Sequence, residues 1–158
     1  MRASKKDIAI ETFSVYIRLS KYSFGESVMK ELEIAFKALA DESRLRILNL
    51  LFASGELCVC DVEAITGFTQ TKVSRHLLYL KNAGLLDSRQ HGLWMLYKIA
   101  TPKNDEHRQL LDCLEQILQS NTVAQRDTKE LAKNIKKGCC TTFSTIKPNQ
   151  IPANLELN

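Results

Sequence analysis

The chain has 158 residues, of which 44% are hydrophobic and 25% are charged. This length suits one domain with a modest core, and the aromatic content of 7% favours a helical protein. The formal net charge of +4 suits an anionic partner without requiring one. We find no secretory segment and no apolar run long enough to span a membrane, so we expect a cytoplasmic protein.

The first predicted helix begins at Met29, because apolar residues then recur at helical spacing as far as Leu39. Residues 1–28 have no single period and are expected to form an N-terminal extension, with Met29 as an alternative natural start. A second helix is predicted after Asp41, a good N-cap, and Gly55 is suited to ending it in a left-handed conformation.

The middle of the chain predicts two helices that are joined by a turn. Residues 57–59 are expected to be extended and to lead into a short helix over about 60–66, which Gly67 breaks. Thr69 is then the N-cap of a longer helix that reaches about Ala83.

The C-terminal part predicts a hairpin followed by further helices. Two strands, 85–89 and 94–99, surround a turn that contains Gly92. A fifth helix begins at about Asn104, and a weaker helical stretch covers 123–137. We therefore divide the chain into an extension over 1–28, a domain over 29–120, and a C-terminal arm and tail over 121–158.

Short helix, turn, second helix and hairpin, in this order, are typical of a winged helix-turn-helix protein. We thus expect a mainly α fold of about five helices with a two-stranded β-hairpin wing. A reading helix presents polar and cationic groups to DNA, where Gln suits an adenine edge and Arg a guanine edge. The residues assigned to DNA contact are Gln70, Thr71, Lys72, Ser74, Arg75 and His76 on the helix and Arg89 in the wing.

Residues 36–48, 56–61, 70–77 and 84–86 resemble the ArsR/SmtB family of metalloregulatory repressors. The resemblance runs from about Met29 to Leu118. It implies a homodimer that sits on a roughly palindromic operator without an ion and releases the DNA when an ion binds. It further implies a dimer interface between the first and last helices of the domain. The residues assigned to that interface are Leu32, Phe36, Leu110, Leu114, Ile117 and Leu118.

The five cysteines are Cys58, Cys60, Cys113, Cys139 and Cys140. In a cytoplasmic protein such spacings indicate thiol chemistry rather than a disulfide framework. The first two lie at the start of a predicted helix, where the helix N-terminus lowers a thiol pKa and favours the soft thiolate ligand. The third lies on an apolar helix face and is expected to act as a small hydrophobic residue in the core or the dimer seam.

The run from Leu57 to Asp61, Leu-Cys-Val-Cys-Asp, resembles the signature of the arsenic- and antimony-responsive members of the family. We therefore expect As(III) or Sb(III) as the inducer. In the best-known pattern a third cysteine follows the second by three residues, and this chain has Glu63 there. We expect Cys139 and Cys140 to supply the missing sulfur, from the same chain or from the partner.

Other inducers and one other mechanism remain open on the same fold. Cadmium- or lead-responsive members add cysteines from an N-terminal extension, and residues 1–57 contain none. Asp105 and His107 suit the start of a zinc site on the last helix, but no second histidine follows them there. Zinc held by the four thiols at 58, 60, 139 and 140, or a thiol redox switch, are the alternatives. An enzyme is not expected, because it would leave the DNA-reading helix unexplained.

Overall fold

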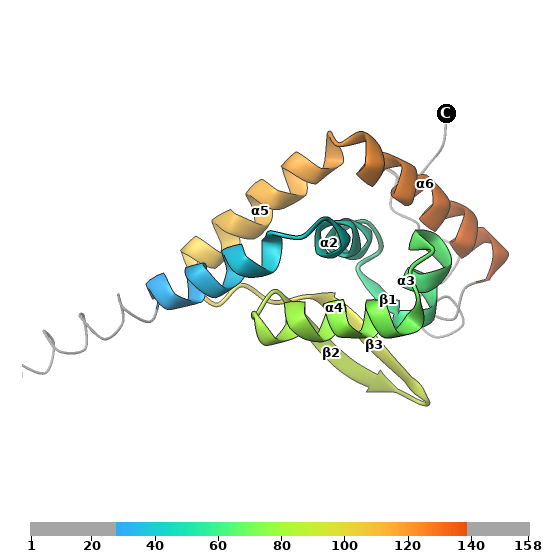
Figure 1. Cartoon of the computed structure of the whole chain (residues 1–158), viewed down its shortest axis with the longest axis horizontal. Helices are drawn as coiled ribbons and strands as arrows, with labels where there is room; N and C mark the ends of the chain where they lie inside the picture. Colours follow the sequence, from blue (N-terminus) through green and yellow to red (C-terminus); the bar gives the residue numbers. More distant parts are fainter. Residues whose placement is uncertain (1–27, 139–158) are drawn as a thin grey trace, which may run out of the picture. The chain divides into compact units, whose positions relative to one another are not determined.

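The computed structural model of the chain describes residues 28–138. It consists of a helix over residues 28–39 followed by α2 (Glu42–Ser54), β1 (Glu56–Cys58), α3 (Val59–Thr66), α4 (Gln70–Asn82), β2 (Leu86–His91), β3 (Trp94–Ile99), α5 (Asp105–Gln119) and α6 (Thr122–Lys137) (Figure 1). The chain divides at Ile34 into two units, and the second unit holds all the labelled elements. Within the described residues no helix is long and apolar enough to cross a membrane.

The ends of the helices are where local chemistry predicts them. The Asp41 side chain accepts a hydrogen bond from the backbone N–H of Arg44, and Thr69 does the same for Lys72. These N-caps satisfy backbone donors that a helix start leaves without an intrahelical partner. Gly67 has a φ of 70°, a left-handed conformation that stops α3 and lets the chain turn tightly into α4.

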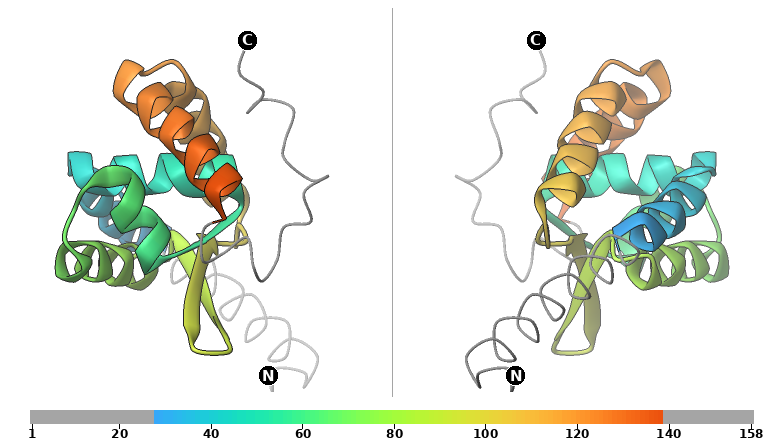
Figure 2. Two further views of the ribbon diagram at one scale, coloured as in Figure 1. Left: turned by 90° about the vertical axis from the view of Figure 1, so that its right-hand side faces the viewer. Right: turned by 90° about the vertical axis from the view of Figure 1, so that its left-hand side faces the viewer.

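The sheet has three antiparallel strands in the order β1–β3–β2. The hairpin prediction is confirmed, although its first strand is Leu86–His91 rather than 85–89. The expected two-stranded wing needs a correction, because β1 also pairs with β3 and places Cys58 opposite Leu96. The β2–β3 hairpin extends away from the helices of its unit (Figure 2). The segment that carries Cys58 is thus built into the base of the wing.

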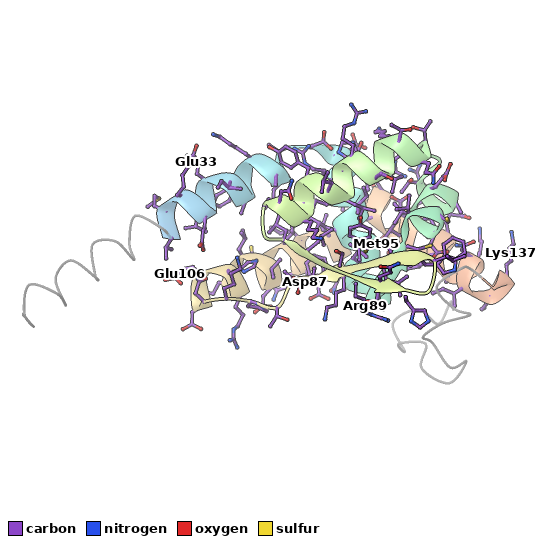
Figure 3. All side chains as sticks on the ribbon, turned by 90° about the horizontal axis from the view of Figure 1, so that it is seen from below. Glu33, Asp87, Arg89, Met95, Glu106 and Lys137 are labelled. Atoms are coloured by element: carbon purple, nitrogen blue, oxygen red, sulfur yellow. The ribbon has the colours of Figure 1, made fainter. Side chains whose placement is uncertain are left out.

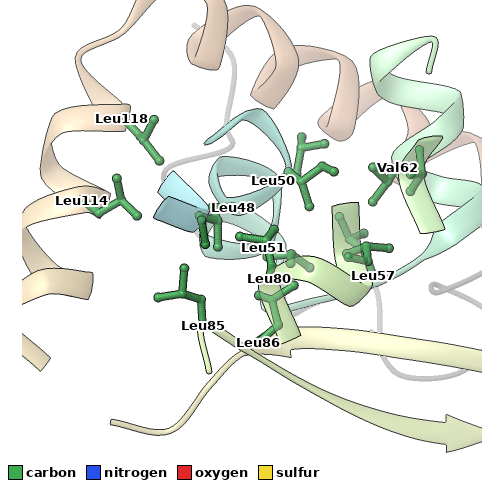
Figure 4. Close-up of a cluster of buried hydrophobic side chains, with 14 of the residues drawn as sticks. Leu48, Leu50, Leu51, Leu57, Val62, Leu80, Leu85, Leu86, Leu114 and Leu118 are labelled. Atoms are coloured by element: carbon green, nitrogen blue, oxygen red, sulfur yellow. The ribbon is translucent and has the colours of Figure 1, made fainter. Parts of the chain in front are cut away.

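The core is built around α2, which packs against α3, α4, α5, α6 and the sheet. Leucine side chains from these elements meet in one cluster (Figure 4). Leu48 and Leu51 of α2 are buried together with Leu80 of α4 and Leu57 of β1. Each buried leucine contributes roughly 1.5–3 kcal/mol by leaving water. This packing fixes α3 and α4 on a common support.

The helix α6 belongs to the folded unit and is not a loose arm. It packs on α2 and α3, and Leu131 is fully buried in the core. The Asn49 amide on α2 donates hydrogen bonds to the Ala124 carbonyl at 3.0 Å and to the Thr128 hydroxyl at 3.2 Å. The packing therefore continues past residue 120, where the sequence analysis ended the domain. The sequence pattern over 123–137 gave only a weak indication of this packing, because polar residues on α2 and α6 form much of the contact.

Candidate nucleic-acid interface and thiol site

The helix α4 has one buried face and one exposed face. Val73, Leu77 and Leu80 are buried against the core. Four of the side chains assigned to DNA contact lie outside this stripe and are exposed: Gln70, Thr71, Ser74 and Arg75. Among the described residues no ion pair ties the Arg75 guanidinium. The first two turns of α4 thus present amide, hydroxyl and guanidinium groups together, as a major-groove reader requires.

Lys72 is turned toward the protein rather than away from it. Its Nζ lies 3.8 Å from the centroid of the Phe68 ring, in the turn between α3 and α4. The Arg46 guanidinium lies 4.8 Å from the centroid of the same ring. Cations are attracted to the face of an aromatic ring, so Phe68 holds both side chains close to the turn.

His76 lies between α4 and the start of α2. Its Nδ1 is 4.0 Å from Oδ1 of Asp41, and the side chain is only 15% exposed. Burial lowers the pKa of His76, although the Asp41 carboxylate acts in the opposite direction. His76 is thus a packing residue that is separate from the exposed set, and its assignment to DNA contact receives no support from its position.

Arg89 lies on the β2–β3 hairpin (Figure 3) and is engaged by a carboxylate. Its Nε donates to Oε1 of Glu56 at 2.8 Å, and its Nη2 donates to Oε2 at 2.6 Å. This contact raises the pKa of Arg89. The geometry is bidentate, which fixes the guanidinium on β1. The sequence analysis assigned Arg89 to DNA contact, but the structure engages its guanidinium with Glu56, so Arg89 clamps the wing to β1.

The two thiols at the start of α3 differ in their surroundings. Cys58 is the N-cap residue of α3 and is buried, whereas Cys60 lies in the first turn and is half-buried. The Cys58 thiol donates a hydrogen bond to Oδ2 of Asp61 at 3.1 Å. Burial, together with the Asp61 carboxylate, raises the pKa of Cys58 to about 12. The expectation that the helix N-terminus favours the Cys58 thiolate is wrong, because burial outweighs the helix effect.

Of the four cysteines assigned to an ion, the described residues include Cys58 and Cys60. Among residues 28–138 no group of three or more His, Cys, Asp and Glu side chains lies close enough together to hold a metal ion. Cys139 and Cys140 lie outside the described residues. Cys113 is exposed on α5, so it does not lie in the core of its own chain, and its place in the dimer seam stays a prediction.

The residues assigned to a dimer interface fall into two groups. Leu114 and Leu118 are buried in the core of the single chain, so reading them as seam rather than core was wrong. Phe36 and Ile117 are each 59% exposed. Leu110 is partly buried against the core, and Leu32 belongs to the N-terminal unit. A helical face of leucines cannot by itself distinguish the chain's own core from a partner's.

Three residues shape the site although the sequence analysis assigned no role to their side chains: Glu56, Asp61 and Phe68. Asp61 follows the N-cap by three residues, the spacing at which acidic side chains reach back to a helix start. The spacing could therefore have predicted the contact between Asp61 and Cys58. The contacts of Glu56 with Arg89 and of Phe68 with Arg46 join elements far apart in the chain, and no local pattern predicts them.

Comparisons with known proteins agree with this geometry. Residues 41–88 match the family model "Bacterial regulatory protein, arsR family". The chain is 49% identical over 65 residues to the arsenical resistance operon repressor of Escherichia coli K12, covering 41% of the chain and 56% of that relative. It thus spans little more than half of that protein. It is also 36% identical over 111 residues to the arsenical resistance operon repressor of Staphylococcus aureus, covering 70% of the chain and 97% of that relative.

A solved structure supports the fold assignment. The homodimeric winged helix-turn-helix DNA-binding domain Mb0332 of Mycobacterium bovis, determined by NMR, superimposes with a TM-score of 0.50 and 30% sequence identity. The match covers 61% of this chain and 86% of that one.

Proposed function

Because the chain belongs to the ArsR family of bacterial regulatory proteins, we propose that it is a repressor that binds operator DNA as a homodimer. In this proposal As(III) or Sb(III) releases the DNA when cysteine thiolates bind the ion. One observation carries the proposal: Cys58 and Cys60 lie at the start of α3, and a turn at Gly67 joins α3 directly to the exposed reader α4.

The DNA step rests on the exposed face of α4. Gln70 and Arg75 would contact base edges in the major groove, with Thr71 and Ser74 beside them. The backbone N–H groups at the start of α4 suit a phosphate. Two copies of α4 related by a two-fold axis would read two half-sites about one helical turn apart.

The dimer step rests on apolar side chains that the single chain leaves exposed. Phe36 and Ile117 have more than half of their surface in solvent, and they come from the two helices that the family resemblance assigns to the interface. Burial of such side chains in a second copy would stabilise the dimer. The homodimeric state of the similar M. bovis domain supports this step.

The ion step uses thiol chemistry on α3. As(III) would enter as arsenous acid, and each As–S bond that forms would replace one As–O bond, with the thiol proton and the released hydroxide leaving as water. Asp61 lies within hydrogen-bond distance of the Cys58 sulfur and could relay the proton of that thiol to the hydroxide. The third sulfur would come from Cys139 or Cys140. The helix α6 packs against α3 and ends at Lys137, so the chain approaches these cysteines from a helix already beside the sensor.

The coupling step follows from burial and linkage. The Cys58 sulfur is buried and hydrogen-bonded, so its binding to an ion requires β1 or the start of α3 to shift. Because α3 packs on α4, that shift would change the angle of the reader. An ion that binds the DNA-free form more tightly lowers DNA affinity by the same factor.

The test begins with DNA selected from a random duplex library by the full chain under reducing conditions. Arsenite, antimonite, cadmium and zinc salts are then titrated against the complex, and release is followed by fluorescence anisotropy. We expect release by arsenite and antimonite at concentrations where zinc has no effect. Peroxide is added to a separate sample from which the reductant has been removed. Release by peroxide but not by arsenite would replace the ion sensor with a redox switch, and release by cadmium alone would change the inducer.

Serine variants locate the sulfurs. The double variant Cys58→Ser/Cys60→Ser should bind the selected DNA and fail to release it with arsenite. The double variant Cys139→Ser/Cys140→Ser should need more arsenite. Cys113→Ser, an exposed thiol on α5, is the matched control and should respond as the wild type does.

A further inference from the structure

A large apolar side chain lies on the face of α4 that points away from the core. Leu78 is 54% exposed, whereas Val73 and Leu77 of the same helix are fully buried. Leu78 therefore contributes little to the core of its own chain.

The position of Leu78 follows from helix geometry. In an α-helix, residues that are three, four or seven apart share one face, because each turn takes 3.6 residues. Leu78 is three residues from Arg75, four from Ser74 and seven from Thr71, and all three of these are exposed. Leu78 thus extends the row of side chains assigned to DNA toward the C-terminal half of α4.

The neighbouring exposed aromatic residue has a different environment. The Arg44 guanidinium of α2 lies 4.5 Å from the centroid of the Tyr79 ring, so Tyr79 is held toward α2. Leu78 and Tyr79 are the exposed large hydrophobic side chains of α4. Of the two, Leu78 is the one in line with Thr71, Ser74 and Arg75.

We propose that Leu78 is a specificity residue that contacts the C5 methyl group of a thymine in the major groove, an inference that rests on the proposed DNA-binding function. Among the four bases only thymine presents a methyl group there, and apolar side chains recognise it by contact. Gln70 and Arg75 would read hydrogen-bonding edges, and Leu78 would add an apolar reading on the same helix face.

The test removes one methyl group at a time from the DNA. Each thymine of a selected half-site is replaced in turn by deoxyuridine, which keeps the hydrogen-bonding edge and lacks the methyl. For wild type we expect one position per half-site at which affinity falls about fourfold, the factor that burial of one methyl group corresponds to. For Leu78→Ala we expect equal affinity for thymine and deoxyuridine at that position.

A matched control variant distinguishes recognition of the thymine methyl by Leu78 from a general effect of removing an exposed leucine. Leu93→Ala removes a leucine that is 97% exposed in the hairpin turn and does not belong to α4. It should keep the wild-type response to deoxyuridine. Because Leu78 is exposed, Leu78→Ala should keep the wild-type unfolding midpoint, so a loss of discrimination would not reflect misfolding.

The two hypotheses fail in different ways. If wild type tolerates deoxyuridine at every position, or if Leu78→Ala keeps the wild-type sensitivity, Leu78 does not read a methyl group even though the repressor function stands. If no DNA is selected, the proposed function fails and the role of Leu78 fails with it.

Discussion

The Arg46 guanidinium on α2 donates two hydrogen bonds to the Asp127 carboxylate on α6, from Nε to Oδ2 at 2.6 Å and from Nη2 to Oδ1 at 2.9 Å. The side chains are 14% and 2% exposed. The same guanidinium lies over Phe68, in the turn before α4. Arg46 therefore joins the last helix of the unit to the entrance of the reading helix.

Replacing Asp127 by Ala should destabilise the protein strongly. The change would leave the Arg46 charge buried without its carboxylate, for which about 3–5 kcal/mol of unfolding free energy is typical. Urea unfolding at fixed protein concentration measures the loss. The exposed pair Glu130–Lys133 on α6 offers a control, and Glu130→Gln should leave the unfolding midpoint unchanged. An equal midpoint for Asp127→Ala and wild type would contradict the role of the buried pair.

Replacing Arg75 by Ala should weaken binding to selected DNA by roughly tenfold to a hundredfold, because a bidentate contact to a base edge is worth about 1–3 kcal/mol. The unfolding midpoint should not change, since Arg75 is exposed. Lys129→Ala removes the same charge from an exposed position on α6 and should have a much smaller effect. Comparable losses in the two variants would mean that Arg75 acts through net charge alone.

Replacing Glu56 by Gln should increase DNA affinity. The neutral amide would release Arg89 from its bidentate contact, and a free guanidinium on the wing can contact a phosphate. The plot of log affinity against log salt should steepen by about one unit, as one added phosphate contact predicts. The double variant Glu56→Gln/Arg89→Ala should lose the gain. A gain that survives in the double variant would exclude Arg89 as its source.

The stability of the protein should depend on the Cys58 proton at alkaline pH. The pKa of this thiol rises from its ordinary value of 9.0 to about 12 on folding, so the folded state holds the proton more tightly. Its contribution to stability is therefore complete below pH 9 and is lost as the pH rises toward 12. The slope is at most about 1.4 kcal/mol per pH unit for one proton.

Urea midpoints between pH 8 and pH 10.5 measure this dependence. Cys58→Ser keeps a donor for Asp61 and does not titrate, so its midpoint should fall less steeply than that of wild type. Cys113→Ser should follow wild type, because the thiol at that position is exposed. Parallel curves for Cys58→Ser and wild type would show that Cys58 titrates alike in the folded and unfolded states.

Local signals in the sequence predicted most of the fold. Asp41 and Thr69 correctly predicted the starts of two helices, because short polar side chains cap backbone N–H groups. Gly67 correctly predicted the turn between α3 and α4, because glycine tolerates a left-handed backbone conformation. The apolar residues Val73, Leu77 and Leu80 recur at helical spacing, and they form the buried face of α4.

The rest depended on contacts between distant parts of the chain. The sequence analysis left β1 out of the sheet because its partner is β3, about forty residues further along. The position of Cys58 at a helix start suggested an acidic thiol, but burial beside Asp61 decides the sign of its pKa shift. The roles of Arg46 and Arg89 depend on Asp127 and Glu56, which lie far from them in the sequence.

The pairing of β1 with β3 also bears on how the protein opens. The two strands bracket α3, α4 and β2, so both helices lie inside one loop that the β1–β3 ladder closes. Closing a loop of this size is entropically unfavourable and is offset only when the enclosed elements pack. Neither helix is then expected to exchange its amide hydrogens independently of the other. In hydrogen exchange, α3, α4 and β2 should behave as one cooperative unit.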